Sequence, residues 1–217
     1  MTVDTDIIIQ QGQFSRLPIV GNASDAELVG RFSDSGIELS GTAILFGAPV
    51  DFVVTEDRLK DRLVFRANAP KAEWLATLMA STTGLDIKGS LGGKIMLVTG
   101  SALSDFKIEL GLDLADTSID IPAIGWAKLP AEPGSASMRL VLKDGVPLAI
   151  EDIDIEAGSL ATVGRAGFAA PKGNGITISE ASFRRLGWPG NDIGMLELSR
   201  DVDGDWLITA EAKLIDL

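Results

Sequence analysis

Alternation of apolar and polar residues is the feature that most constrains how this chain can fold. The clearest run is FKIELGLDL at 106–114, in which every second residue is apolar. The same period of two recurs at 37–45, 153–157 and 206–214. A period of two places alternate side chains on opposite faces of a β-strand. The chain is therefore expected to form strands that each carry one apolar face.

Shorter apolar runs predict further strands, and turn residues separate them. These runs are Thr5–Gln10, Glu27–Phe32, Val50–Thr55, Arg62–Ala67, Gly93–Thr99, Ala136–Leu142, Leu160–Phe168, Gly175–Phe183 and Gly194–Ser199. The intervening sequences Asp34-Ser35-Gly36, Asp144-Gly145, Lys172–Gly175 and Asp203-Gly204 contain residues that accept positive φ at low cost. Many strands at short spacing with such turns indicate an antiparallel all-β meander.

One segment has a helical pattern instead. Residues 70–80 begin with a proline and continue with good helix formers, and Trp74 and Leu78 are four residues apart. Proline is favoured in the first turn of a helix, and residues four apart lie on one helical face. We expect one short helix at about 70–80, with Gly84 past its end.

The composition excludes several kinds of chemistry. The chain has no His, no Cys and no Tyr, and its formal net charge is −12. A Ser-His-Asp triad, a Cys-His pair, a His/Cys zinc site and disulfides are therefore impossible. The acidic balance argues against nucleic acid as a partner, because phosphate neutralisation needs a basic surface. We expect no catalysis, no cofactor and no metal.

Two acidic clusters were weighed as sites. Asp201, Asp203 and Asp205 resemble the start of a calcium loop, but Gly204 stands fourth rather than sixth and Ala212 stands where the twelfth-position Glu belongs. An acidic hairpin turn explains them better. The carboxylates at 152, 154 and 156 could serve a glycosidase. They are explained equally well by a solvated strand face.

The surplus of apolar strand faces needs a cover, and only one short helix is available for it. Burial of that surface drives folding, so something must lie against it. Two arrangements satisfy this requirement. A second sheet can close over the first as a β-sandwich. Alternatively, one long and highly curved antiparallel sheet can form an apolar groove that holds lipid chains or partners.

The segment 113–128 favours the groove. It reads D-L-x-x-x-x-I-x-I-P-x-x-G-W-x-K and is followed by Pro133-Gly134. With the glycines at 158 and 164 and the stretches 191–192, 204–206 and 213–216, it resembles the AsmA-like family of Gram-negative envelope proteins, in particular the large YhdP-type members. The resemblance covers roughly residues 30–217.

This resemblance implies a β-sheet bridge in the periplasm whose apolar groove carries phospholipids between the inner and outer membranes. The chain is then expected to be a single segment, 1–217, excised from a longer protein that an N-terminal helix anchors in the inner membrane. Its partners would be phospholipid acyl chains and neighbouring segments of the same long chain. The chain itself shows no signal peptide and no run long enough to span a bilayer. The alternative function is a structural or interaction β-sandwich module of an envelope scaffold.

Alternation identifies candidate residues for the groove. The expected lining is Leu39, Leu45, Phe65, Ile95, Leu97, Phe106, Ile108, Leu110, Leu112, Ile153, Ile155 and Ile208. Trp74, Leu78 and Trp126 are candidates for a cap or rim, with ordinary packing as the alternative. The edge strands of an open sheet would be unpaired and prone to association.

Overall fold

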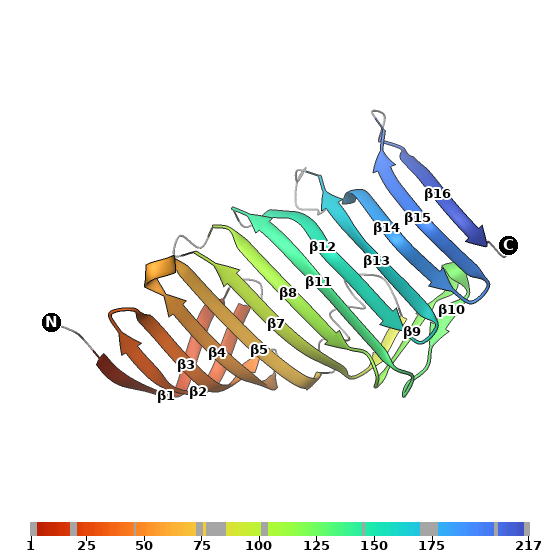
Figure 1. Cartoon of the computed structure of the whole chain (residues 1–217). Coiled ribbons are helices and arrows are strands. Elements are labelled where there is room, and N and C mark those ends of the chain that lie inside the picture. The colour runs from red at the N-terminus through yellow and green to blue at the C-terminus, as the bar shows by residue number, and fades with distance from the viewer. Residues whose placement is uncertain are drawn as a thin grey trace.

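The computed structural model of the chain is an all-β protein with an open, curved sheet (Figure 1). It describes residues 4–17, 21–45, 47–72, 76, 86–100, 104–144, 146–169, 178–201 and 204–214. Thirteen strands form one antiparallel sheet, and three short strands form a second. The large sheet does not close, so the predicted open curved sheet is confirmed and the closed sandwich is not the fold.

The strands of the large sheet follow one another almost in chain order. They are β1 (Asp4–Leu17), β2 (Gly21–Ser33), β3 (Gly36–Leu45), β4 (Ala48–Asp57), β5 (Arg62–Ala72), β7 (Leu91–Thr99), β8 (Phe106–Asp113), β11 (Gly134–Lys143), β12 (Val146–Ala157), β13 (Leu160–Phe168), β14 (Ile178–Trp188), β15 (Asn191–Arg200) and β16 (Trp206–Leu214). A short 3₁₀ turn, η1 (Arg58–Lys60), links β4 to β5. The sheet is therefore a meander, with β1 at one edge and β16 at the other (Figure 1).

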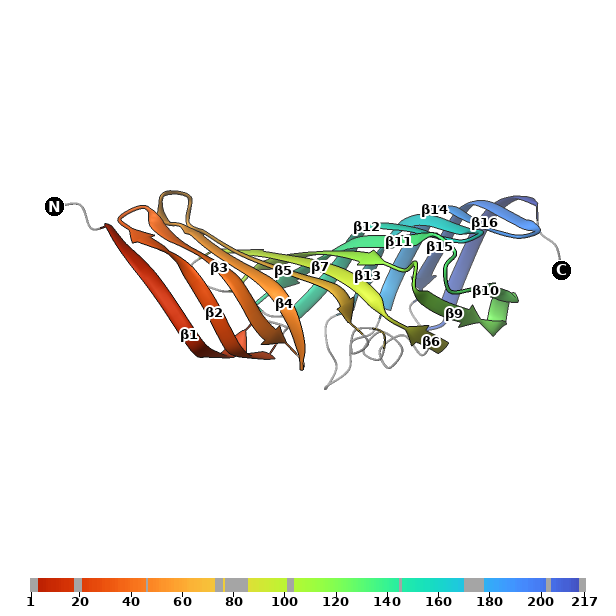
Figure 2. The same cartoon turned by 90° about the horizontal axis from the view of Figure 1, so that it is seen from below.

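The small sheet consists of two excursions from this meander. β6 (Asp86–Gly89) lies between β5 and β7 in the chain, whereas β9 (Thr117–Ile121) and β10 (Trp126–Lys128) lie between β8 and β11. The two excursions meet because β6 pairs with β9 and β9 pairs with β10. Figure 2 shows these strands displaced to one side of the large sheet, toward one end of its strands.

All thirteen strands of the large sheet were predicted from the sequence, although several are longer than expected. The three strands of the small sheet were not predicted. The expected helix is wrong at its start, because residues 70–72 complete β5. Ala76 is helical and buried, while residues 73–75 and 77–85, including Trp74, Leu78 and Gly84, lie outside the described residues.

Pairing of the strands aligns apolar residues in a row across the whole sheet, which we call the cross-strand row. Each member lies opposite the next on the neighbouring strand, so all share one face. The row runs Ile7, Gly30, Leu39, Val54, Phe65, Leu97, Ile108, Leu140, Ile150, Ala166, Ala181, Leu198 and Ile208. We call this the apolar face of the sheet.

The opposite face carries most of the charge. The neighbouring row of paired residues, one position along each strand, includes Asp6, Arg31, Glu38, Lys107 and Glu180. We call this the polar face. A one-residue slip of any strand would exchange the two sets of side chains, so burial of the apolar face fixes the register.

The sheet curls toward its apolar face at the β1 end. The rings of Phe14 on β1 and Phe52 on β4 have centroids 6.4 Å apart, although two strands separate them. In a flat sheet, strands three places apart would lie about 14 Å from each other. Small buried residues on the intervening strands, Ala26 and Ala43, leave room for the two rings to approach over them. The curl therefore contributes to the burial of the apolar face of β2–β4, together with Ala76 in the same cluster.

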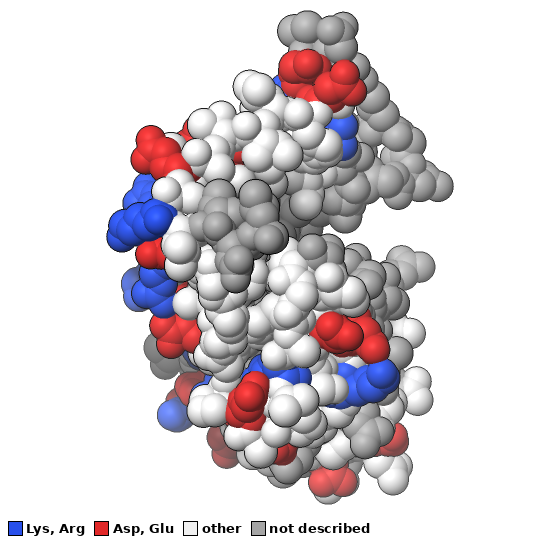
Figure 3. Space-filling model, turned by 90° about the vertical axis from the view of Figure 1, so that its right-hand side faces the viewer, with Lys and Arg blue, Asp and Glu red and all other residues white. Residues whose placement is uncertain are grey.

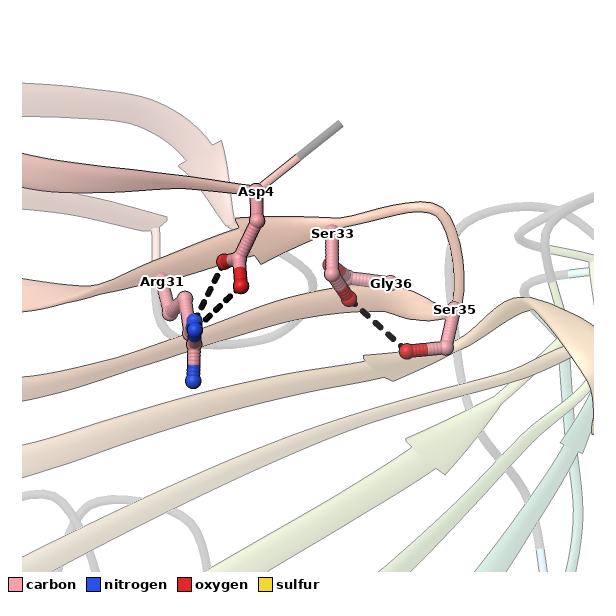
Figure 4. A network of polar contacts seen from close by, with 5 residues as sticks. All are labelled: Asp4, Arg31, Ser33, Ser35 and Gly36. Carbon is pink, nitrogen blue, oxygen red and sulfur yellow. Dashed lines mark hydrogen bonds and ion pairs between the residues drawn. The ribbon is translucent and has the colours of Figure 1, made fainter. Parts of the chain in front are cut away.

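Polar contacts fasten the β1 edge and the β2–β3 turn (Figure 4). The guanidinium of Arg31 on β2 donates two hydrogen bonds to the carboxylate of Asp4 on β1. At the turn, the hydroxyl oxygens of Ser33 and Ser35 lie 2.7 Å apart. The ion pair is exposed, so it aligns the first residues of β1 more than it stabilises the fold.

Replacement of Gly41 by alanine should unfold the curl. A Cβ atom at Gly41 would lie 1.9 Å from the backbone oxygen of Glu27 on β2, so the two strands would have to separate. We expect a loss of about 1–3 kcal/mol in the free energy of unfolding, measured by urea denaturation. Gly111→Ala is the matched control, because a Cβ there meets nothing within 4 Å. An equal loss in both variants would contradict this account of the curl.

Candidate functional site

The apolar face is the candidate functional site, and it collects every described residue of the predicted lining. Pairing places Leu39, Leu45, Phe65, Ile95, Leu97, Phe106, Ile108, Leu110, Leu112, Ile153, Ile155 and Ile208 on this one face. Alternation within single strands could not show that separate strands point the same way. The pairing registers supply that information.

Exposure of this face to solvent increases along the sheet. Leu39, Leu45, Leu97, Phe106, Ile108, Leu112 and Ile153 are buried, and Phe65, Ile95, Leu110 and Ile155 are half-buried. Ile108, near the middle of the sheet, is 2% exposed, whereas Ile208 on the last strand is 63% exposed. The open part of the apolar face therefore lies over β14–β16.

Residues that the sequence analysis did not select form much of this open part. Phe183 on β14 faces Leu196 on β15, and both are half-buried. Leu198 lies beside Ile208 of β16. Their alternation was visible in the predicted strands 175–183 and 194–199, so the signal that could have identified them was present. Figure 3, seen from the β16 side, shows charged side chains along the left margin, at the top and in the lower half of the view, with uncharged side chains between them.

The small sheet covers one end of the apolar face. Its residues Ile87, Ile119 and Ile121 pack against the main apolar cluster, which includes Leu114 and Trp126. The same cluster contains Ala157 and Leu160 from the β12–β13 hairpin. Trp126, a candidate rim residue, is 3% exposed and belongs to this packed interface. A helix was expected to pack over the apolar face. The small sheet, which was not predicted, covers part of it.

The structure explains several residues of the segment 113–128 by their local geometry. Pro122 begins a 3₁₀ turn, η2 (Pro122–Ile124), and Gly125 ends it in the left-handed conformation with φ 62°. Glycine adopts that conformation without a Cβ penalty. The turn brings β10 back along β9, and the indole N–H of Trp126 then donates to the hydroxyl of Ser159 at 3.2 Å. The hydrogen bond fastens the small sheet to the β12–β13 hairpin.

Lys128 is buried at the same interface, with 1% of its surface exposed. Its ammonium group donates to the carbonyl oxygens of Thr117 at 2.9 Å, Leu129 at 3.1 Å and Ala115 at 3.5 Å. Three acceptors match the three donors of an ammonium group. Desolvation lowers the pKa of Lys128 below its ordinary value. The side chain therefore joins β9, β10 and the loop after β10, adding a hydrogen bond to carbonyls of which those of Ala115 and Leu129 also accept backbone N–H groups.

The polar face carries ion pairs and a shallow hollow. Arg139 lies between Glu109 at 3.6 Å, Glu151 at 3.7 Å and Asp152 at 2.6 Å, and Glu156 pairs with Arg185 at 3.0 Å. The carboxylates weighed as a glycosidase pair thus include two that are held by arginines. The hollow, about 590 Å³, extends across β4–β12 and is lined by Arg66, Lys94 and Arg139 among others.

The other acidic cluster forms a turn. The carboxylate of Asp201 accepts a hydrogen bond from the backbone N–H of Asp205 at 2.9 Å. The backbone N–H of Asp201 donates in turn to the carbonyl of Asp205 at 2.9 Å. Asp203 lies outside the described residues. Within the described ranges, no three acidic side chains are grouped closely enough to hold a metal ion.

In comparisons with known proteins, no family model, no curated protein and no solved structure matches the chain. The resemblance to the AsmA-like family therefore stays a prediction. In the part of the chain that the structure describes, no helix is long and apolar enough to cross a bilayer.

Replacement of Lys128 by methionine should destabilise the protein. The methionine side chain fills a similar volume but cannot donate, so the buried carbonyl of Thr117 loses the ammonium donor and those of Ala115 and Leu129 keep only their backbone N–H partners. We expect the free energy of unfolding to fall by about 1–3 kcal/mol in urea titrations at neutral pH. Lys107→Met, at an exposed position of β8, is the matched control and should change stability by less than about 0.5 kcal/mol.

The same residue should give the stability a dependence on alkaline pH. Because the pKa of Lys128 is lower in the folded chain than in the unfolded chain, the unfolded chain binds more protons between the two values. The free energy of unfolding therefore gains a contribution that rises with pH up to about 10.4, the ordinary lysine value. The difference in stability between the wild type and Lys128→Met should grow over this range. A difference that shrinks as pH rises would contradict the lowered pKa.

Proposed function

We propose that this chain is a non-catalytic segment of a cell-envelope lipid conduit, in which the apolar face of the sheet binds phospholipid acyl chains. The cross-strand row carries the proposal, because it presents apolar side chains on twelve of the thirteen strands, with Gly30 on β2 as the exception. An acyl chain could pass from strand to strand along such a row without meeting a charge. The resemblance of segment 113–128 to the AsmA-like family supports the same function.

Burial of methylene groups would supply the affinity. Each buried CH₂ contributes about 0.8 kcal/mol, so an acyl chain of about sixteen carbons could contribute on the order of 10 kcal/mol before the costs of association. Aliphatic side chains provide this without fixing the chain at one position. Entry would be at β14–β16, where the apolar face is open, and the polar headgroup would remain in water.

Charge supports a location between membranes. The formal net charge of −12 opposes contact with an anionic bilayer surface. A segment that spans the space between two membranes avoids such contact. Together with the resemblance to the AsmA-like family, this supports our proposal that the chain is periplasmic, part of a protein anchored in the inner membrane, with neighbouring segments of the same long chain as its other partners.

A second candidate function is a structural or interaction module of an envelope scaffold. Burial of the apolar face over β2–β8 favours it, because Leu39, Leu97 and Ile108 are already withdrawn from solvent. In that function the apolar face is an ordinary protein core and holds no lipid. The two candidate functions differ at β16: the lipid conduit requires the exposed apolar face there to bind phospholipid, and the module does not.

A matched pair of substitutions on β16 tests the lipid conduit. Ile208 and Leu207 are adjacent, 63% and 60% exposed, and lie on the apolar and polar faces respectively. Native mass spectrometry of protein purified without detergent should find phospholipid on the wild type and on Leu207→Glu. The Ile208→Glu variant should retain several-fold less, because it places a charge at the open end of the apolar face.

Uptake of a fluorescent phospholipid from vesicles should rank the three proteins in the same order. Circular dichroism confirms that both variants are folded, which their exposure leads us to expect. A wild type that neither retains nor takes up phospholipid would contradict the lipid-conduit function, and the structural or interaction module would remain. Equal losses in both variants would show that the apolar face does not determine binding.

A further inference from the structure

The last strand of the sheet, β16, has one neighbour and no cover in the described structure. All nine of its residues are exposed, including Trp206, Leu207, Ile208 and Leu214. An edge strand with exposed apolar side chains is a template for pairing with another strand. This feature is independent of lipid binding, because it concerns the backbone edge of the sheet rather than its apolar face.

The two edges of the sheet differ in how well they are protected. β1 is interrupted by three register shifts against β2, and Gln11 within it has a positive φ of 51°. Bulges of this kind twist an edge strand and disrupt further pairing. Register alone does not separate the edges, because residues 4–9 of β1 and 206–211 of β16 are both continuous and both strands shift register beyond them. The described residues of β16 contain no positive φ and are all exposed, so β16 is the edge better suited to accept another strand.

The backbone alternation of β16 shows which groups point away from β15. The N–H of Asp201 bonds to the carbonyl of Asp205 at 2.9 Å, which makes that facing pair hydrogen-bonded. Because hydrogen-bonded and non-hydrogen-bonded pairs alternate, the pairs that contain Trp206, Ile208 and Ala210 are non-hydrogen-bonded. The N–H and C=O groups of these residues therefore point outward, toward the position of an added strand.

Symmetry distinguishes between the possible occupants. Because strand directions alternate and both edges are odd-numbered positions in the sheet order, β1 and β16 run in the same direction. Continuation of the sheet from β16 to β1 of another copy, with the apolar faces on the same side, would therefore need parallel pairing. Two β16 strands related by a two-fold axis pair antiparallel instead, as every strand of the large sheet does, and antiparallel pairing is the more stable.

We propose that β16 pairs antiparallel with β16 of a second copy, centred on Ala210, to form a symmetric dimer. This register places Ile208 opposite Ala212 of the second copy and Trp206 opposite its Leu214, so that the regular part of β16 meets the part beyond Glu211 where its register against β15 shifts. Large apolar side chains then meet on one face, where such pairs stabilise a sheet. The dimer joins the two sheets into one, with both apolar faces on the same side.

Charge on the polar face suits the same register. Lys213 of each copy lies diagonally across from Asp205 of the other, within reach of a long side chain. Within its own chain, Lys213 has only a distant contact with the carboxylate of Asp192, at 4.0 Å. Glu211 lies opposite Thr209 of the second copy and diagonally across from its Glu211, so the register has one diagonal like-charge contact and none directly opposite.

Cysteine substitution tests the pairing and its register, because the chain contains no cysteine of its own. In the proposed dimer two copies of Ala210→Cys lie opposite each other, with Cα atoms about 5.5 Å apart, which permits a disulfide. Two copies of Ala212→Cys are offset by four residues, about 14 Å along the strand. Mild oxidation should therefore cross-link Ala210→Cys at least ten-fold more than Ala212→Cys. Equal cross-linking, or a preference for position 212, would overturn the register.

Sedimentation of the cysteine-free chain tests the association itself. The wild type should sediment at twice the monomer mass, and Ala210→Pro should weaken the dimer at least ten-fold. Proline there removes an N–H that points away from β15, so the monomer keeps its own hydrogen bonds. Ile208→Lys, which places like charges in the interface, should weaken the dimer as well. A wild type that stays monomeric, or that forms an open series of larger oligomers, would overturn the proposal.

The outcome can be separated from that of the lipid conduit. A monomeric Ala210→Pro variant that still retains phospholipid shows that the apolar face works without the dimer. A dimeric wild type that binds no phospholipid supports the β16 pairing and contradicts the lipid-conduit function. Pairing through β1, revealed by cross-linking of Ile8→Cys rather than Ala210→Cys, would contradict the choice of edge.

Discussion

The whole structure depends on the removal of one long apolar sheet face from water. A meander of thirteen strands produces that face automatically, because each hairpin aligns apolar side chains with those of its neighbour. At the β1 end the sheet curls until Phe14 meets Phe52. At one end of the central strands the small sheet lies over the face. Over β14–β16 the face stays open, and the functional proposals begin there.

The two faces perform separate physical tasks. Leu97 and Ile108 on the apolar face contribute burial, while Arg139 on the polar face gathers three carboxylates that would otherwise repel one another in an acidic chain. At the interface of the small sheet, one residue combines burial with a polar contact. Lys128 carries an ammonium group into a packed region, where only backbone carbonyls receive it. Such a group specifies one arrangement of β9 and β10, because any other leaves it unpaired.

Alternation and short apolar runs were enough to predict every strand of the large sheet. They left a closed sandwich and an open curved sheet both possible, and only the resemblance of segment 113–128 favoured the open sheet. Alternation failed at the small sheet, because β6, β9 and β10 are short and alternate over too few residues, as at Trp126–Lys128. The helix at 70–80 was wrong at its start because a proline can also lie in a strand end, as Pro70 does in β5. For the candidate site, alternation chose lining residues that share one face, but the gradient from Ile108 to Ile208 depends on tertiary curvature, which no local pattern records.

The near-identity of chain order and sheet order has a consequence for how such a protein folds and changes. Each strand of the large sheet contacts strands that are close in sequence, so its contact order is low for an all-β protein and assembly can extend one hairpin at a time. The two excursions that form the small sheet leave the meander between adjacent strands and return without disturbing the order. A hairpin gained or lost in the same way would lengthen or shorten the sheet while every remaining pairing stayed intact, much as a solenoid tolerates a change in its number of repeats.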